Sequence, residues 1–189
     1  MQLHLVRHGE SAWNAQGRLQ GQVMAVPLTE LGRRQAAALA EQVAALGGVG
    51  TVLSSDQARA WQTAVMIGER LGIRPRATPL LRERALGGLA GQQVAEPDPR
   101  RPDAEGEPLA ELVARAGSVR QLLAEVAGAA EDCGAGDIVV VTHGTFLAVL
   151  LAVLDDQPLE QMRWPARIPH AQLLTRRMSR DPRDPGARR

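Results

Sequence analysis

The chain has 189 residues, of which 44% are hydrophobic and 23% charged, and its formal net charge is +1 at pH 7. These values exclude a chain that is disordered throughout, and no apolar run approaches the roughly 18 residues of a membrane span. The single cysteine excludes an internal disulfide and a cysteine-based zinc cluster. Because the chain starts without a charged leader and an apolar segment, we expect a cytoplasmic protein that has no membrane partner.

All 22 basic residues are arginine, and they are unevenly distributed. The segment Arg176–Arg189 has six arginines and two aspartates, a charge of +4 that leaves −3 for the rest of the chain. A mildly acidic body argues against a nucleic-acid partner, which requires a clustered basic surface. We predict one domain over residues 1–175, followed by a disordered, arginine-rich tail over residues 176–189.

Apolar periodicity predicts strands that alternate with helices along the chain. The first half is predicted as a strand at Leu3–Val6, a helix from Pro27–Thr29 to Leu46, a strand at Val49–Leu53 and a helix from caps at Ser54–Asp56 to Leu71. The second half is predicted as a strand at Ile73–Thr78, a loop over Ala95–Pro108, a helix at Leu109–Ala130, a strand at Ile138–Val141, a helix at Thr145–Leu154 and an edge strand at Ile168–Thr175. This alternation predicts an α/β fold, a three-layer α/β/α sandwich with a mostly parallel central sheet.

Two of the four histidines directly follow predicted strands, and each is followed by glycine. They are His8, after the first strand, and His143, after the strongly apolar strand near the end of the chain. Ligands of such sheets bind beyond the carboxyl ends of the strands, and glycine allows close approach of backbone to a ligand. We therefore interpret His8 and His143 as functional, and His4 and His170 as structural.

Arginines beside these positions indicate a phosphate ligand. Arg7 adjoins His8, and Arg59 opens the helix after the second strand. Helix N-termini present free N–H groups to anions, and a guanidinium group can bind two phosphate oxygens at once. The sequence offers no acidic cluster or paired-histidine spacing for a metal. We therefore expect no metal and no other cofactor, with arginine charge and a histidine nucleophile performing the chemistry.

The segment Leu5-Val6-Arg7-His8-Gly9-Glu10-Ser11 resembles the signature of the histidine phosphatase superfamily, in its phosphoglycerate-mutase-like branch (branch 1). Further segments resemble family motifs in the family's order, as far as about Leu151. They are Gly17–Gly21, Pro27–Gly32, Ser54–Asp56 with Arg59–Ala64, Leu81–Glu83 with Gly87 and Gly91, Gly106–Glu107 with Arg115, and Val140–Gly144. The resemblance implies a phosphoglycerate mutase-like fold.

The resemblance also implies a role for each residue of the site. His8 would attack phosphorus and become a phosphohistidine, while Glu83 would protonate the departing oxygen and then take a proton from water. Arg7, Arg59 and His143 would surround the phosphoryl oxygens, where charge accumulates in the transition state. The implied catalytic residues are therefore His8, Glu83, His143, Arg7 and Arg59. The implied phosphate-binding residues are Arg7, Asn14, Gln20, Gly21, Arg59, His143 and Gly144.

The family contains both mutases and phosphatases. Its mutases carry a longer segment after the acid motif, with aromatic and lysine residues, whereas this chain has only Ala85–Glu107 there and no tyrosine or lysine at all. We therefore expect a metal-independent phosphomonoesterase whose substrate partner is a small phosphorylated metabolite. The alternatives are a phosphoglycerate mutase, a phosphoprotein (phosphohistidine) phosphatase, or a module that binds a phosphorylated ligand. A homodimer is left open.

Three segments depart from the family pattern: Gln22–Val26, Leu89–Gly91 and Gly106–Pro108. All three lie where the resemblance places recognition of the leaving group rather than of the phosphate. The resemblance therefore extends to the phosphoryl chemistry and not to the identity of the metabolite.

Overall fold

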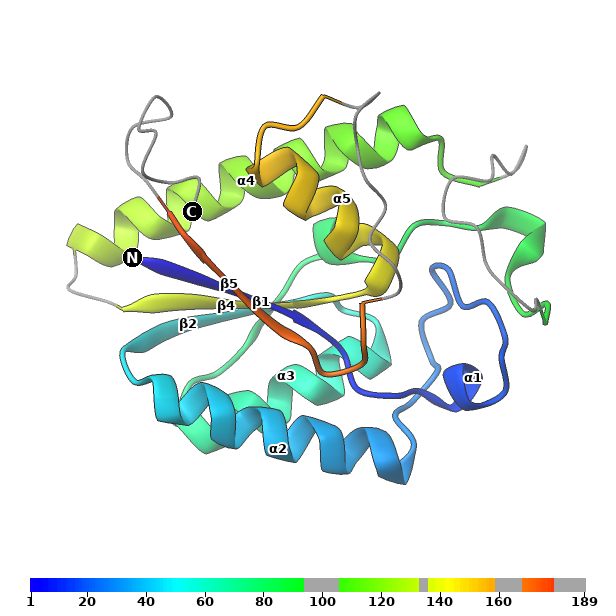
Figure 1. Cartoon of the computed structure of the whole chain (residues 1–189), viewed down its shortest axis with the longest axis horizontal. Coiled ribbons are helices and arrows are strands. Elements are labelled where there is room, and N and C mark those ends of the chain that lie inside the picture. The colour runs from blue at the N-terminus through cyan, green and yellow to red at the C-terminus, as the bar shows by residue number, and fades with distance from the viewer. Residues whose placement is uncertain (94–105, 133–135, 159–167, 179–189) are drawn as a thin grey trace.

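A computed structural model describes residues 1–93, 106–132, 136–158 and 168–178 of the chain (Figure 1). The strands are β1 (Gln2–Arg7), β2 (Val49–Ser54), β3 (Arg76–Ala77), β4 (Asp137–Thr142) and β5 (Leu173–Arg177). The α-helices are α1 (Ala12–Ala15), α2 (Glu30–Leu46), α3 (Ala58–Leu71), α4 (Leu109–Asp132) and α5 (Gly144–Leu154). Two short 3₁₀ helices are η1 (Pro79–Leu81) and η2 (Gly87–Leu89).

The described strands form one five-stranded sheet in the order β3-β2-β4-β1-β5. The first four of these run parallel, and β5 pairs antiparallel with β1 at the edge. Figure 1 shows α2 and α3 on one face of the sheet and α4 and α5 on the other. The predicted three-layer sandwich with a mostly parallel sheet is confirmed.

Alternate side chains of the strands fill two separate cores. Leu5 and Val140 pack on the side of α4 and α5, whereas Val6, Val139 and Val141 pack on the side of α2 and α3. A slip of one residue would exchange the two sets of side chains, so burial on both faces fixes the register of the strands. The register therefore also fixes where each strand ends, and with it the position of the residue that follows.

Two predicted elements on either side of α3 differ in the structure. Ser54–Asp56 does not cap α3, because the N-cap is Gln57, which makes no side-chain cap hydrogen bond. The third strand is reduced from Ile73–Thr78 to Arg76–Ala77, which pairs only with the last two residues of β2. Beyond Ala77 there is no further β2 backbone to pair with, because β2 ends at Ser54, and before Arg76 the chain is still leaving α3, where Ile73 N–H donates to the Gly68 carbonyl at 2.9 Å.

The last strand starts later than the sequence predicts. Instead of spanning Ile168–Thr175, β5 begins at Leu173 and ends at Arg177. The residues just before it form a turn in which Gln172 N–H donates to the Pro169 carbonyl at 3.3 Å. This turn lies beside the end of β1, because β5 is antiparallel to β1 and its first residue, Leu173, pairs with Val6.

The predicted boundary between the domain and the tail falls inside β5. Arg176 pairs with Leu3 and Arg177 with Gln2, so the first two residues of the expected tail belong to the sheet. Residues 179–189 lie outside the described part of the chain, as does most of the predicted loop Ala95–Pro108. Within the described ranges, no helix is both long and apolar enough to cross a bilayer.

The loop after β1 packs directly on the first turn of α2, at two glycines. A Cβ atom on Gly9 would lie 2.4 Å from the carbonyl oxygen of Gly32, and one on Gly32 would lie 1.9 Å from that of Glu10. The same loop accepts a hydrogen bond from the backbone of Thr29, the N-cap of α2, at 3.0 Å. The start of α2 therefore fixes the backbone that follows His8.

We predict that Gly32→Ala lowers the free energy of unfolding by about 2 kcal/mol, because the added methyl group must displace backbone rather than a flexible side chain. Urea denaturation measures the change. Gly128→Ala is the matched control: it lies in α4 with no atom within 4 Å of the added Cβ, and should stabilise by about 0.5–1 kcal/mol. Similar effects of the two substitutions would contradict the close contact.

Candidate active site

His8 and His143 lie side by side at the carboxyl ends of the neighbouring strands β1 and β4. In the register Arg7 lies opposite Thr142, and His8 N–H donates to the Thr142 carbonyl at 3.0 Å. The two imidazole ring centroids are 5.0 Å apart, with an angle of 64° between the planes. His8 is 2% exposed and His143 fully buried. The structure thus brings together the two histidines that the sequence analysis selected.

The ring of His8 is held in one orientation by its neighbour. Its Nδ1 donates to the carbonyl oxygen of Gly9 at 2.6 Å, so in the neutral ring Nε2 carries the lone pair. Burial lowers the pKa of His8 well below the usual histidine range, and the positive charges of Arg59 and Arg7 lower it further. His8 is therefore neutral at pH 7 and presents a basic nitrogen to the site.

Arg59 reaches the site from the first turn of α3 and is 1% exposed. Its terminal nitrogens donate to the backbone carbonyls of Gly21 at 2.9 Å and Val23 at 3.0 Å. Burial and the charge of Arg7 lower the pKa of Arg59 to about 10, against the opposing effect of the Glu83 carboxylate. Arg59 is therefore still a cation at neutral pH. Its buried Nε has no hydrogen-bond partner among the described residues.

Arg7, the last residue of β1, is 7% exposed and is held by the turn before β5. Its guanidinium group donates to the carbonyl of Ile168, and a terminal nitrogen lies 2.9 Å from Nε2 of His170. A Cβ on Gly144 would lie 3.4 Å from Arg7 Nε. The first residue of α5 is therefore packed closely against this guanidinium group.

The second histidine has a different set of neighbours. Its Nε2 lies 2.9 Å from Ser55 Oγ, and its buried Nδ1 has no partner within the described ranges. Burial lowers the pKa of His143 well below the usual range, and the positive charges of Arg59 and Arg7 act in the same direction. His143 is therefore also neutral at pH 7.

The carboxylate of Glu83 sits at the N-terminus of α5, immediately after His143. It accepts hydrogen bonds from the backbone N–H groups of Thr145 at 3.1 Å and Phe146 at 2.9 Å. A third comes from the N–H of Arg84, at 2.9 Å. Backbone N–H groups at the start of a helix thus fix both oxygens of this carboxyl group. Glu83 is partly buried, as its implied role requires.

Asn14 and Gln20 belong to a small network around Ser11. Asn14 Oδ1 accepts from Ser11 N–H at 3.1 Å in a capping box at α1, and Ser11 Oγ lies 2.7 Å from Gln20 Oε1. The oxygen of Asn14 is thus occupied, and its amide hydrogens are the part that can donate to a ligand. The contacts of both side chains are to Ser11 rather than to the histidine pair.

Three residues at the site were missed or assigned otherwise from the sequence. His170, interpreted as structural, contacts Arg7, and its ring centroid lies 6.1 Å from that of His8. Gln57 links the two loops of the site, accepting from Glu83 N–H at 2.8 Å and donating to the Gly21 carbonyl at 3.0 Å. Ser55, expected to cap α3, contacts His143. His170 lies beside the end of β1 because the last strand pairs antiparallel with β1.

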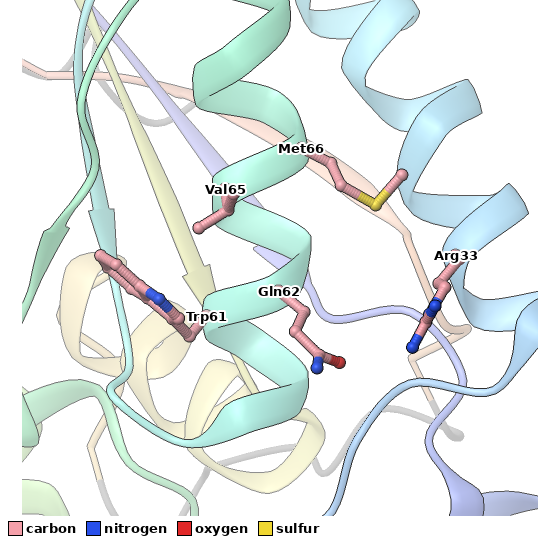
Figure 2. Close-up of a pocket in the computed structure, with 5 residues that line it drawn as sticks. All are labelled: Arg33, Trp61, Gln62, Val65 and Met66. Carbon is pink, nitrogen blue, oxygen red and sulfur yellow. The ribbon is translucent and has the colours of Figure 1, made fainter.

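A surface hollow of about 380 Å³ lies elsewhere, over α3. Figure 2 shows Gln62 and Met66 pointing from α3 toward Arg33 of α2, with Trp61 and Val65 completing the lining. None of these five residues is among the predicted site residues. The hollow is therefore separate from the cluster of histidines and arginines.

Comparison with known proteins identifies the family. The model of the histidine phosphatase superfamily (branch 1) matches residues 3–182. The chain belongs to this superfamily. It is 35% identical over 182 residues to a glucosyl-3-phosphoglycerate phosphatase of Mycobacterium tuberculosis, covering 87% of this chain and 78% of that protein. It is 32% identical over 177 residues to the probable phosphoglycerate mutase GpmB of Yersinia pestis, covering 86% and 79%.

The solved structures agree with this assignment. A mycobacterial glucosyl-3-phosphoglycerate phosphatase in complex with VO3 superposes with a TM-score of 0.82 at 32% identity, covering 93% of this chain and 92% of that one. The resemblance inferred from the motifs is thus confirmed. This histidine phosphatase is a phosphomonoesterase that works through a phosphohistidine intermediate.

We predict that the two buried neutral histidines make the fold sensitive to acid. Below about pH 6.5 the unfolded chain binds protons on His8 and His143 that the folded chain excludes, so the free energy of unfolding falls as pH falls. Each histidine contributes about 1.4 kcal/mol per pH unit until its folded-state pKa is reached. Urea denaturation at pH 7.5, 6.5 and 5.5 measures the slope.

The double variant His8→Gln/His143→Gln is the reference for this measurement, because it keeps polar side chains of similar size that do not titrate. Its unfolding free energy should fall less steeply between pH 6.5 and 5.5 than that of the wild type. Parallel slopes would show that the folded protein protonates these rings as readily as the unfolded chain does.

Proposed function

We propose that this phosphatase hydrolyses a small phosphorylated metabolite with His8 as its nucleophile. The observation that carries the proposal is the orientation of His8. Its Nδ1 donates to Gly9 at 2.6 Å, which leaves the Nε2 lone pair free in a ring kept neutral by burial and by Arg59 and Arg7. A neutral, oriented imidazole among cations is suited to attack a phosphorus atom whose oxygens those cations bind.

Arg7, Arg59 and His143 are the proposed binding groups for the phosphoryl oxygens. Two nearly buried guanidinium cations match the charge of a phosphomonoester dianion, and guanidinium forks fit phosphate oxygens. Arg59 Nε and His143 Nδ1 are buried and have no partner in the part of the chain that the structure describes, so a bound oxyanion can satisfy them. The amide hydrogens of Asn14 are a further donor in this proposal.

Glu83 is the proposed acid and base. In the first step the His8 Nε2–P bond forms as the P–O bond to the leaving group breaks, and Glu83 gives its proton to the departing oxygen. In the second step water attacks phosphorus, Glu83 takes a proton from that water, and the N–P bond breaks. The start of α5, directly after His143, holds both oxygens of the Glu83 carboxyl group, and this fixed position supports proton transfer by Glu83.

Glucosyl-3-phosphoglycerate is the first substrate to test, because a relative 35% identical to this chain is named as its phosphatase. A phosphoglycerate mutase is the second candidate, since another relative is named a probable enzyme of that kind. The two functions differ in the acceptor of the phosphoryl group. A phosphatase releases inorganic phosphate, whereas a mutase interconverts 3-phosphoglycerate and 2-phosphoglycerate.

We predict that the wild type releases phosphate from 4-nitrophenyl phosphate and from at least one metabolite of a phosphosugar and phosphoglycerate panel. His8→Asn should lower kcat by about 10⁴-fold or more, because the variant keeps an amide near Gly9 but has no nucleophilic nitrogen. Circular dichroism checks its fold. Wild-type activity that survives in His8→Asn would contradict the proposed nucleophile, and isomerisation of 3-phosphoglycerate faster than phosphate release would favour the mutase.

We also predict that excess EDTA leaves phosphate release unchanged within about twofold. The reason is that guanidinium and imidazole groups, rather than a divalent cation, neutralise the phosphoryl oxygens in the proposed mechanism. The assay compares protein before and after dialysis against chelator. Loss of activity that a divalent cation restores would contradict the proposal that arginine and histidine side chains neutralise the phosphoryl oxygens.

A further inference from the structure

The loop that carries Glu83 is held from behind by Arg115 of α4. One terminal nitrogen of Arg115 donates to the carbonyls of Leu80 at 2.8 Å and Arg82 at 2.7 Å, and the other lies 3.4 Å from the carbonyl of Glu83. Three backbone carbonyls of a four-residue stretch therefore converge on one guanidinium group. The backbone of Glu83 cannot shift without breaking this set.

Arg115 also forms a two-point ion pair with Glu107. Arg115 Nε donates to Glu107 Oε1 at 2.8 Å, and a terminal nitrogen donates to Oε2 at 2.7 Å. The two side chains are only 15% and 11% exposed. The attraction between such buried charges offsets the cost of removing them from water only when their hydrogen-bond geometry is good. With the three carbonyls, all five N–H donors of the guanidinium group have an acceptor.

Glu107 holds the same loop on the other side of Glu83. Its Oε2 accepts from the N–H of Ala85 at 3.2 Å, and its own N–H donates to the Ala85 carbonyl at 2.9 Å. Its carbonyl accepts from Arg84 Nε at 2.8 Å. Arg115 thus fixes the backbone up to Glu83, and Glu107 fixes the backbone after it.

The side chain of Glu83 is coupled to the same arginine. The guanidinium carbon of Arg115 lies 4.3 Å from the ring centroid of Phe146, and Phe146 N–H donates to Glu83 Oε1 at 2.9 Å. Arg115 therefore contacts both the backbone of Glu83 and the residue whose N–H binds its carboxylate. One side chain connects both ends of Glu83 to the body of the protein.

We propose that Arg115, with Glu107, is a positioning residue that sets the carboxyl group of Glu83 at the leaving-group oxygen. The inference rests on the proposed role of Glu83 as acid and base. Proton transfer to that oxygen requires a hydrogen-bond distance, and small displacements of a positioned group cost large factors in rate. Arg115 is not expected to touch the substrate.

The leaving group provides a readout that a merely structural role does not move. A substituted phenolate that is a weak base departs with little help from an acid, whereas a more basic leaving oxygen needs the proton from Glu83. Loss of positioning should therefore slow the hydrolysis of poor leaving groups more than that of good ones. General instability would lower all rates by the same factor.

The experiment measures kcat and kcat/KM for substituted phenyl phosphates of similar size, from 4-nitrophenyl to 4-methoxyphenyl phosphate. Arg115→Met should lower kcat/KM, which reports phosphoryl transfer to His8, for 4-methoxyphenyl phosphate by about 10–100-fold, within the range of general acid catalysis, and for 4-nitrophenyl phosphate by about threefold or less. Arg115→Lys should show a smaller change of the same kind, because lysine keeps the charge without the planar fork.

Three further variants make the outcome decisive. Glu83→Gln should show the steepest dependence on the leaving group. Arg120→Met is the matched control: Arg120 is also on α4 and pairs with Asp156, but it contacts α5 rather than the Glu83 loop. This control should lower all rates alike or leave them unchanged. Glu107→Gln replaces Arg115→Met if the latter does not fold, with the same expected pattern.

The possible failures are distinguishable. The positioning role alone would be overturned if the loss of rate rises steeply with the basicity of the leaving group in Glu83→Gln but not in the Arg115 and Glu107 variants. If the loss of rate in Glu83→Gln is the same for all leaving groups, the proposed role of Glu83 as the acid is overturned, and the inference with it. The same dependence in Arg120→Met would show a general effect of weakening α4 and would also overturn the inference.

Discussion

Two imidazole rings and two guanidinium groups are packed together, almost without access to water, where β1 and β4 end side by side. Burial lowers the pKa of both histidines and of Arg59, and the mutual repulsion of the cations adds to each shift. The histidines respond by staying neutral, whereas the arginines remain charged. The result is a site with neutral imidazole rings and buried positive charge, an arrangement that a phosphate dianion complements.

The rest of the structure maintains this arrangement. Burial of the strands on both faces fixes the register that places His8 beside His143. The glycine contact with α2 fixes the loop after His8, and the turn before β5 holds the guanidinium group of Arg7. The N-terminus of α5 holds the carboxylate of Glu83. The groups proposed to bind phosphate and to transfer protons are thus held by different elements that meet at one edge of the sheet.

The sequence predicted the parts of the site that follow from local pattern. His8 and His143 were found because they end apolar strands and precede glycine, and parallel strands end at one edge of a sheet. Arg59 was found because it opens the helix after the second strand, and family motifs added Glu83 and Asn14. The layers of the fold followed from the alternation of strands and helices.

The sequence did not predict features that depend on contacts between distant segments. His170 lies 162 positions after His8 and reaches the site only because β5 is antiparallel and starts at Leu173. Ser55 has the pattern of a helix cap, but its hydroxyl contacts a histidine 88 residues away. Likewise, Arg115 has no local signal that it would bind the backbone near Glu83. Periodicity and capping rules describe neighbours along the chain, whereas these contacts arise from tertiary packing.

Trapping the covalent intermediate tests the central claim most directly. The protein is mixed with a ³²P-labelled phosphomonoester, quenched in alkali within milliseconds and digested for mass spectrometry. The account predicts one labelled phosphohistidine at His8 that is stable in alkali and lost in acid, and none in His8→Asn. Label on another residue, or a wild type that turns over substrate without forming any labelled protein, would contradict it.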